Sequence, residues 1–138
     1  MSKAFTATPL FDAHKAFVRL PMGLAMLNEY PDSKQFVETI CETIPDARED
    51  FLHTQAFLKS YSRKSEATYR SYRNEVERLL LWSWTVAKKS IVSLKRADLE
   101  AYFEFVHSPP AHWVALSVAD RFKPIGGQSC QNQNWRPF

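Results

Sequence analysis

The fold is decided by the stretch between Ser60 and Trp84, which reads SYSRKSEATYRSYRNEVERLLLWSW. It joins arginines and lysines, aromatic residues and a run of leucines in one segment. We expect a long helix here, because Ser65 suits an N-cap and apolar residues recur at helical spacing as far as about Ala87. Glu66 would lie at the positive end of this helix, where an acid is stabilising.

The two sides of this helix are predicted to differ. The apolar stripe consists of Tyr69, Tyr72, Val76, Leu79, Leu80, Ser83 and Ala87. The polar face consists of Arg70, Arg73, Asn74, Glu77 and Arg78. Leu81, Trp82 and Trp84 widen the apolar side, so this end should be buried on more than one side. The tyrosines and tryptophans are interpreted as core packing, not as a platform on which bases stack.

The rest of the chain is also predicted to be helical. We expect helices over 32–43, 46–61 and 97–108, and a weaker helix over 112–121. Asp32 or Ser33 would cap the first, and Asp46 the second with Glu49 three residues on. Residues 123–138 show little periodicity, and no strand is predicted. The sequence therefore indicates an all-α protein, a small bundle of four or five helices with no significant sheet.

Composition fits a globular domain. The 138 residues are 45% hydrophobic and carry a net charge of +3. Cys41 and Cys130 lie far apart without a CxxC pattern, so we expect reduced thiols, with Cys41 in the core. The N-terminal stretch lacks the apolar region of a signal peptide, and no window is long enough to cross a bilayer. We therefore expect a soluble, cytoplasmic protein.

The sequence gives little support for an enzyme. Its histidines form no metal-binding pattern, and motifs such as GxSxG, the P-loop and GxGxxG are not found. We predict no catalytic residue, no metal ligand, no cofactor and no small-molecule substrate.

The strongest functional signal is a basic block between Arg63 and Arg96, which holds nine basic residues against three acids. Cations and hydroxyl groups at a helix N-terminus suit DNA phosphates. The candidate phosphate contacts are Arg63, Lys64, Ser65, Thr68, Arg70 and Arg73, with Ser71 and Asn74 placed to reach base edges. A second contact would consist of Lys88, Lys89, Lys95 and Arg96. The alternative is a protein-interaction or dimerisation module whose basic face is merely solvated.

Two runs, FLKSYSRKSEATYRSYRNEVERLLLWSW and SIVSLKRADLEAYFEFV, resemble the N-terminal core-binding domain of tyrosine recombinases, the phage integrase family. The matching features are Ser65, Thr68 and Tyr72 at a helix start, the stretch 79–84, and the triplet 97–99. The later PPAHWV and NWRPF stretches are also similar to a bacterial subgroup, so the resemblance covers about residues 46–138.

The resemblance implies a SAM-like helical domain that clamps one face of a recombination-site duplex, encoded by a bacterium or phage. Residues 46–122 would be this domain, 1–45 an N-terminal helical extension of unknown role, and 123–138 a linker or truncated segment. Family members continue into a catalytic domain with a tyrosine nucleophile, so we expect no strand transfer from this chain by itself. The expected partner is double-stranded DNA.

Without a following helix, apolar surface on Leu79, Trp82, Trp84 and Phe103 needs a cover. The candidates are residues 1–45 and a second copy of the chain. Further partners of the chain would be another copy of itself or the missing catalytic domain. Replacement of Arg73 by Glu is predicted to weaken DNA binding without unfolding the domain.

Overall fold

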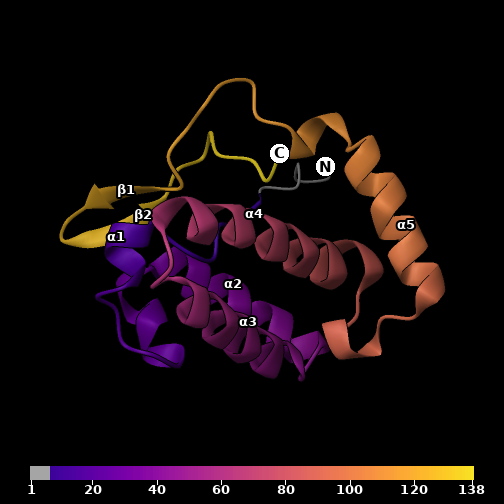
Figure 1. Cartoon of the computed structure of the whole chain (residues 1–138), viewed down its shortest axis with the longest axis horizontal. Helices are drawn as coiled ribbons and strands as arrows, with labels where there is room; N and C mark the ends of the chain where they lie inside the picture. The colour runs from indigo at the N-terminus through magenta and orange to yellow at the C-terminus, as the bar shows by residue number, and fades with distance from the viewer. Residues whose placement is uncertain (1–6) are drawn as a thin grey trace.

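The computed structural model describes residues 7–138, and this part of the chain is mostly helical (Figure 1). The α-helices are α1 (His14–Phe17), α2 (Pro31–Thr43), α3 (Ala47–Tyr61), α4 (Glu66–Trp82) and α5 (Arg96–His107). Short 3-10 helices cover η1 (Leu24–Glu29), η3 (Ile91–Ser93) and η4 (Ala111–Trp113). A π-helical turn, η2 (Ser83–Ala87), extends α4. Two strands, β1 (Phe122–Ile125) and β2 (Gln128–Gln131), follow near the C-terminus.

The long helix begins and ends where its sequence predicts. The hydroxyl of Ser65 accepts a hydrogen bond from the backbone N–H of Thr68 at 3.0 Å, which confirms the N-cap. At the other end Lys88 adopts the left-handed conformation, with φ of 59°, after the π-helical turn. The backbone N–H of Lys89 then donates to the Ser83 carbonyl at 2.9 Å and closes the helix.

Helices α2 and α3 also match the predicted ranges, but neither has the predicted capping bond. Asp46 precedes α3 with helical dihedral angles, and its side chain makes no capping bond. Helix α2 begins at Pro31, whose fixed φ suits the first helical position. Ser33 lies within the first turn, and its hydroxyl donates to the Pro9 carbonyl at 2.6 Å. Asp46 thus occupies the predicted N-cap position of α3 without the capping bond. The predicted cap of α2 is wrong, because Tyr30 is at the N-cap position and Ser33 binds the N-terminal segment instead.

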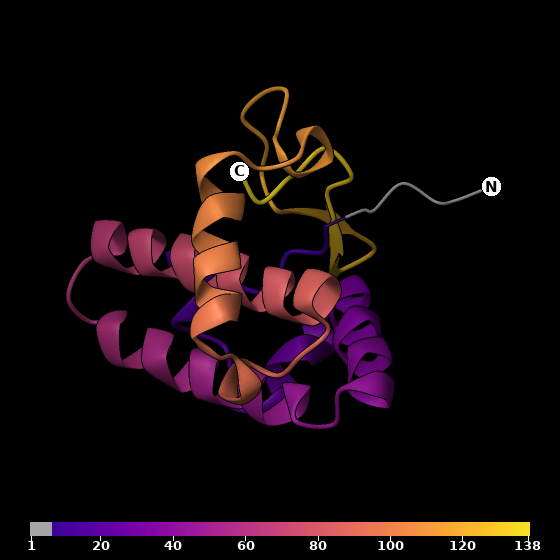
Figure 2. The same ribbon diagram turned by 90° about the vertical axis from the view of Figure 1, so that its right-hand side faces the viewer.

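Helices α3 and α4 lie antiparallel, and the N-terminal segment packs with them in a single core (Figures 1 and 2). The ring of Phe11 stacks on that of Phe51 with centroids 5.3 Å apart, and Phe17 lies 4.9 Å from Tyr69. Residues 7–44 thus contribute to the same core as the segment that resembles the recombinase domain.

The apolar surface at the end of α4 is covered from two directions. Phe36 of α2 packs against Trp84 with ring centroids 6.2 Å apart. Tyr102 of α5 packs against Trp82 at 5.2 Å. Phe103, on the outer side of α5, remains 66% exposed. The N-terminal region therefore covers part of this surface, as one of the two expected alternatives proposed, while Phe103 stays in solvent.

A buried carboxylate fixes this end of α4 to α3. Asp50 is fully buried, and its carboxylate accepts hydrogen bonds from the Trp84 indole at 3.0 Å, the Ser90 hydroxyl at 2.7 Å and the Ile91 backbone N–H at 3.0 Å. A buried charge is tolerated when hydrogen bonds of this kind satisfy it. Asp50 therefore determines where the chain turns from α4 toward α5.

The C-terminal region departs from the predicted linker. Strands β1 and β2 form an antiparallel hairpin in which Phe122 is opposite Gln131 and Ile125 is opposite Gln128. Gly126 and Gly127 form its turn with positive φ values of 59° and 80°, which favour glycine in a two-residue hairpin loop. The prediction of no strand is therefore wrong for these residues.

The weaker helix predicted over 112–121 is also absent from the described structure. Only Ala111–Trp113 form a 3-10 turn, and the chain then continues as an irregular loop that contacts its own C-terminus. The Ala115 N–H donates to the Phe138 carbonyl at 2.7 Å, and the Phe138 N–H donates to the Trp113 carbonyl at 3.0 Å. These bonds to a distant segment replace the local bonds that a helix would need.

Candidate nucleic-acid interface

Three cations project into solvent around the N-terminal end of α4. Arg63 and Lys64 lie in the turn between α3 and α4, and Arg70 lies one turn into the helix. All three side chains are exposed, and none forms an ion pair with any residue from 7 to 138. We call Arg63, Lys64 and Arg70 the N-terminal basic cluster. Lys64 also lies 5.8 Å from the ring centroid of Tyr61, and the exposed Glu66 in the first turn offsets one of the three positive charges.

The capped end of α4 lies within this cluster. Ser65 is exposed and Thr68 half-buried, and the Ser65 hydroxyl donates to the Thr68 hydroxyl at 2.8 Å. The first backbone N–H groups of a helix have no acceptor within the helix, and they carry partial positive charge. The three cations thus lie near the N-terminal amides of α4, and both kinds of group attract anions.

Arg73 does not belong to this exposed surface. Its side chain is only 7% exposed, and its guanidinium donates to the Asp12 carbonyl at 3.2 Å. It also lies 5.8 Å from the ring centroid of Tyr69. Burial lowers the pKa of the Arg73 guanidinium, and the nearby charge of Arg121 acts in the same direction. The assignment of Arg73 to a DNA contact is therefore wrong, because this side chain holds the N-terminal segment to α4.

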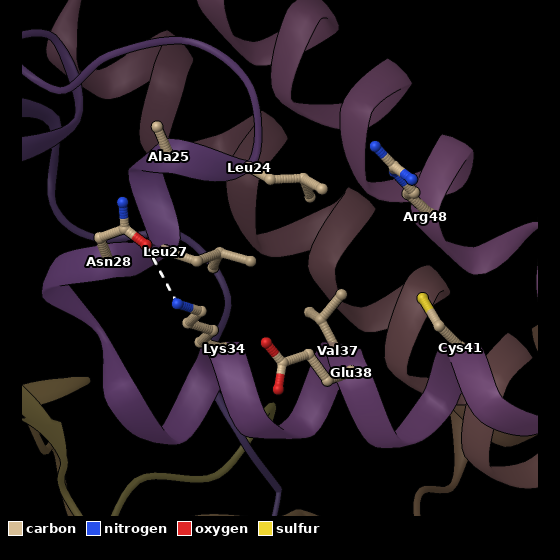
Figure 3. A pocket seen from close by; sticks show the side chains of 9 residues that line it. All are labelled: Leu24, Ala25, Leu27, Asn28, Lys34, Val37, Glu38, Cys41 and Arg48. Carbon is tan, nitrogen blue, oxygen red and sulfur yellow. Dashed lines mark hydrogen bonds between the residues drawn. The ribbon is translucent and has the colours of Figure 1, made fainter.

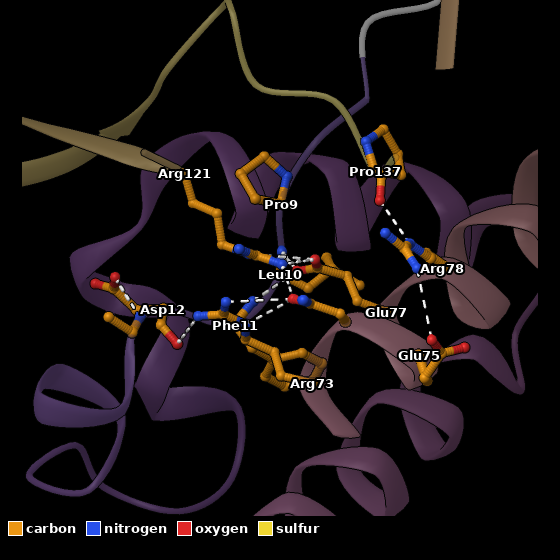
Figure 4. A network of polar contacts seen from close by, with 12 residues as sticks. Pro9, Leu10, Phe11, Asp12, Arg73, Glu75, Glu77, Arg78, Arg121 and Pro137 are labelled. Atoms are coloured by element: carbon orange, nitrogen blue, oxygen red, sulfur yellow. Dashed lines mark hydrogen bonds and ion pairs between the residues drawn. The ribbon is translucent and has the colours of Figure 1, made fainter. Parts of the chain in front are cut away.

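Glu77, which was placed on the polar face, is also buried. Its carboxylate accepts hydrogen bonds from the backbone N–H groups of Leu10 at 2.8 Å and Phe11 at 3.2 Å (Figure 4). The other carboxylate oxygen accepts a hydrogen bond from Arg121 at 2.8 Å. Three segments, around residues 11, 77 and 121, thus meet at one carboxylate. No pattern in the sequence connects them.

Asn74 and Ser71 differ in their freedom to contact a base. The Asn74 side-chain oxygen accepts hydrogen bonds from Arg73 at 3.2 Å and from Arg121 at 2.8 Å, so this acceptor is already used. Ser71 is exposed. Of the two residues predicted to contact bases, only Ser71 is exposed to solvent.

The second predicted contact lies at the opposite end of α4. Lys88, Lys95 and Arg96 are exposed, and Arg96 pairs with Glu100 at 3.1 Å in solvent. Lys89 is committed to Asp98, with its ammonium 2.9 Å and 3.1 Å from the two carboxylate oxygens. Hydrogen bonding from the Lys95 backbone N–H and from Lys89 lowers the pKa of the Asp98 carboxyl.

The spacing of the two basic regions matches the repeat of DNA. Because an α-helix rises about 1.5 Å per residue, Ser65 and Lys88 lie roughly 30 to 35 Å apart along α4. One turn of B-DNA spans about 35 Å. The two basic regions are therefore separated by about the length of one duplex turn.

The aromatic residues of α4 mostly pack in the core, as predicted. Tyr69, Trp82 and Trp84 are buried. Burial also raises the pKa of the Tyr69 hydroxyl, which donates to the Asp12 carbonyl at 2.7 Å. Tyr72 is partly exposed and contacts the ring of Tyr61 edge-on at 4.8 Å.

A separate cavity of about 450 Å³ lies between η1, α2 and α3 (Figure 3). Leu24, Leu27 and Val37 extend toward it, and charged side chains lie at its rim. Cys41 also lines this cavity and is half-buried, and burial raises the pKa of its thiol. The thiolate, which is the reactive form, is therefore disfavoured, and we assign no chemistry to this hollow.

Within residues 7–138, no group of three or more His, Cys, Asp or Glu residues is arranged to hold a metal ion. None of the helices in this range is long and apolar enough to cross a membrane. No protein-family model, curated protein or solved structure matches the chain.

Proposed function

We propose that this chain is a double-stranded-DNA-binding module. The observation that carries the proposal is the N-terminal basic cluster, whose three cations are exposed and unpaired among the described residues at the capped end of a long helix. Phosphate contacts require cations on a rigid element. The second basic region, at the far end of the same helix, supports contact with one face of a duplex.

We further infer a place for this module in site-specific DNA recombination. The basis is the resemblance of residues 46–138 to the core-binding domain of tyrosine recombinases, with Ser65 and Thr68 at the helix start. In this proposal the helical bundle is SAM-like and grips the recombination-site duplex. Strand transfer would require a catalytic domain, so the chain alone binds DNA without cutting it.

A fluorescence anisotropy titration with a duplex of about 25 base pairs tests the proposal. Each phosphate that a cation neutralises releases counterions, and log affinity falls with log salt by about 0.9 per phosphate. We expect the slope of log affinity against log salt to be about 3 or more in magnitude, because three cations without an ion pair lie at one end of α4. Binding that does not respond to salt, or no binding at low salt, would contradict the proposal.

A second candidate function is self-association through α5. Leu99 and Phe103 lie one helical turn apart and are both exposed. In an antiparallel pairing of two α5 helices, Leu99 of one copy would contact Phe103 of the other. Lys95 and Arg96 of one copy would then approach Glu104 of the other. Analytical ultracentrifugation decides this candidate: a dimer that Phe103→Glu dissociates supports it, and a monomer at all concentrations excludes it.

A further inference from the structure

Three arginines from separate parts of the chain line one cavity of about 180 Å³. Arg78 comes from α4, Arg121 precedes β1, and Arg136 lies near the C-terminus. Asn74 and Ser117 also line this space, which we call the arginine pocket. Sequence patterns do not bring these residues together, because they depend on the C-terminal segment folding back onto α4.

Two of these guanidinium groups are held in place by aromatic rings. Arg78 lies 4.4 Å from the ring centroid of Phe138, and its Nε donates to the Pro137 carbonyl at 2.6 Å (Figure 4). Arg121 lies 5.0 Å from the ring centroid of Trp135. Cation–π contacts of this kind fix the plane of the guanidinium. An anion entering the pocket therefore meets donors that are already oriented.

The hydrogen-bonding capacity of the three arginines is not used up. Nη2 of Arg78, Nη1 of Arg121, and Nε and Nη2 of Arg136 make no hydrogen bond within residues 7–138. An arginine has five N–H donors, so several remain for a ligand.

The charge of the pocket is positive. Its three guanidinium groups are accompanied by two carboxylates, Glu75 and Glu77. Glu77 is 1% exposed and accepts bonds from Arg121 and two backbone N–H groups. Glu75 is exposed and lies 3.5 Å from Arg78. One positive charge is thus left over beside the unused donors.

We propose that the arginine pocket binds a phosphoryl group. The planar forks of arginine match the oxygen geometry of phosphate, and charge-assisted hydrogen bonds are about twice as strong as neutral ones. A volume of about 180 Å³ is well above the roughly 10–15 Å³ that a cavity needs to hold one water, so there is room for a phosphoryl group. The ligand is either a backbone phosphate of DNA or a free phosphorylated molecule. The proposal does not depend on the N-terminal basic cluster.

Isothermal titration with inorganic phosphate, at constant ionic strength set with chloride, tests this site. We compare the wild type with Arg136→Ala and with Ser117→Asp, which adds a repelling carboxylate to the pocket wall. Arg136→Ala is expected to raise the dissociation constant for phosphate by about tenfold, the usual effect of losing one charge-assisted hydrogen bond. Ser117→Asp is expected to raise it by a similar factor, because its carboxylate repels the anion. Lys123→Ala removes an exposed cation outside the pocket and should bind phosphate like the wild type.

The proposal is overturned if the wild type does not bind phosphate, or if both variants bind it as well as the wild type does. A DNA titration of Ser117→Asp identifies the source of the phosphoryl group. Weakened DNA binding assigns it to the DNA backbone, and unchanged DNA binding assigns it to a free phosphorylated ligand. Alanine at Arg63, Lys64 and Arg70 should leave phosphate binding intact. The phosphate-pocket proposal and the DNA-binding proposal can therefore be contradicted separately.

Discussion

The cations of the segment from Ser60 to Trp84 divide into two groups with different surroundings. Arg63, Lys64 and Arg70 are exposed and unpaired among the described residues. Arg73 is buried, and Arg78 is half-buried against Phe138. Residues with the same charge and within a few positions of one another thus serve different purposes. The first group is available to a partner, and the second joins distant parts of the fold.

The buried stripe of α4 explains this division. Tyr69, Arg73, Glu77 and Leu80 follow one another at helical spacing, and all four are buried. The predicted stripe shares Tyr69 and Leu80 with the buried one, but the sequence pattern places Arg73 and Glu77 on the polar face. A charge that interrupts an apolar helix can therefore lie in the core when partners from other segments satisfy it.

The largest effect is expected from Glu77→Ala. This change leaves Arg121 and the Leu10 and Phe11 backbone N–H groups without their acceptor in the interior. Removal of one partner from a buried ion pair costs about 3–5 kcal/mol of unfolding free energy. Urea denaturation measures the loss. Glu75→Ala, on the exposed side of the same helix, is the control, and equal effects from the two variants would contradict the network.

Asp50→Asn is expected to have a somewhat smaller effect. The amide keeps one oxygen that can accept hydrogen bonds. Its NH₂ group replaces the other carboxylate oxygen and faces a donor that it cannot accept from. We predict a loss of about 2–3 kcal/mol, from weaker hydrogen bonds and an unsatisfied buried group. Asp46→Asn is the control, since Asp46 is exposed and makes no capping bond. A loss no larger than that of the control would show that the Asp50 contacts are not stabilising.

Arg73→Ala and Arg70→Ala compare the two groups of cations directly. We expect Arg73→Ala to lower the unfolding free energy by about 2 kcal/mol, because the charged hydrogen bond to the Asp12 carbonyl is lost. Arg70→Ala should change it by no more than about 0.5 kcal/mol, as is usual for surface positions. Guanidinium denaturation of both variants gives the result. The reverse order of stability would break the distinction between buried and exposed cations.

The smallest effect concerns pH and Asp98. Because its pKa is lowered in the folded state, ionised Asp98 stabilises the protein above its unfolded pKa of about 3.9, and the stabilisation is lost as the pH falls through the lower folded value. Asp98→Asn should therefore reduce the melting temperature slightly at pH 7, and the difference from the wild type should shrink toward pH 2. A constant difference across this range would exclude the predicted linkage.

Local signals predicted the helices well. The ranges 46–61 and 97–108 compare with α3 at Ala47–Tyr61 and α5 at Arg96–His107. Helical periodicity and the prolines that end helices act over a few residues, so the sequence contains them directly. The hairpin was missed, although Gly126-Gly127 is a known turn signal, because the strands beside it do not alternate clearly between apolar and polar residues.

The candidate site was predicted less completely than the helices. Exposure of Arg63, Lys64 and Arg70 agrees with their assignment to a polar surface, whereas Arg73 was assigned wrongly. Its burial depends on Asp12, which is remote in sequence and reaches α4 only after the chain has folded. The binding of DNA by the exposed cations remains a prediction.

The most direct test is the salt dependence of DNA binding in two charge-matched variants. One replaces Arg63, Lys64 and Arg70 by alanine, and the other replaces Lys34, Arg48 and Lys123, three exposed cations elsewhere. Both variants reduce the net charge from +3 to zero. We predict that the first lowers the slope of log affinity against log salt by up to about 2.7, at about 0.9 per phosphate, and that the second leaves it nearly unchanged. Equal slopes for the two variants would contradict the assignment of the N-terminal basic cluster to DNA.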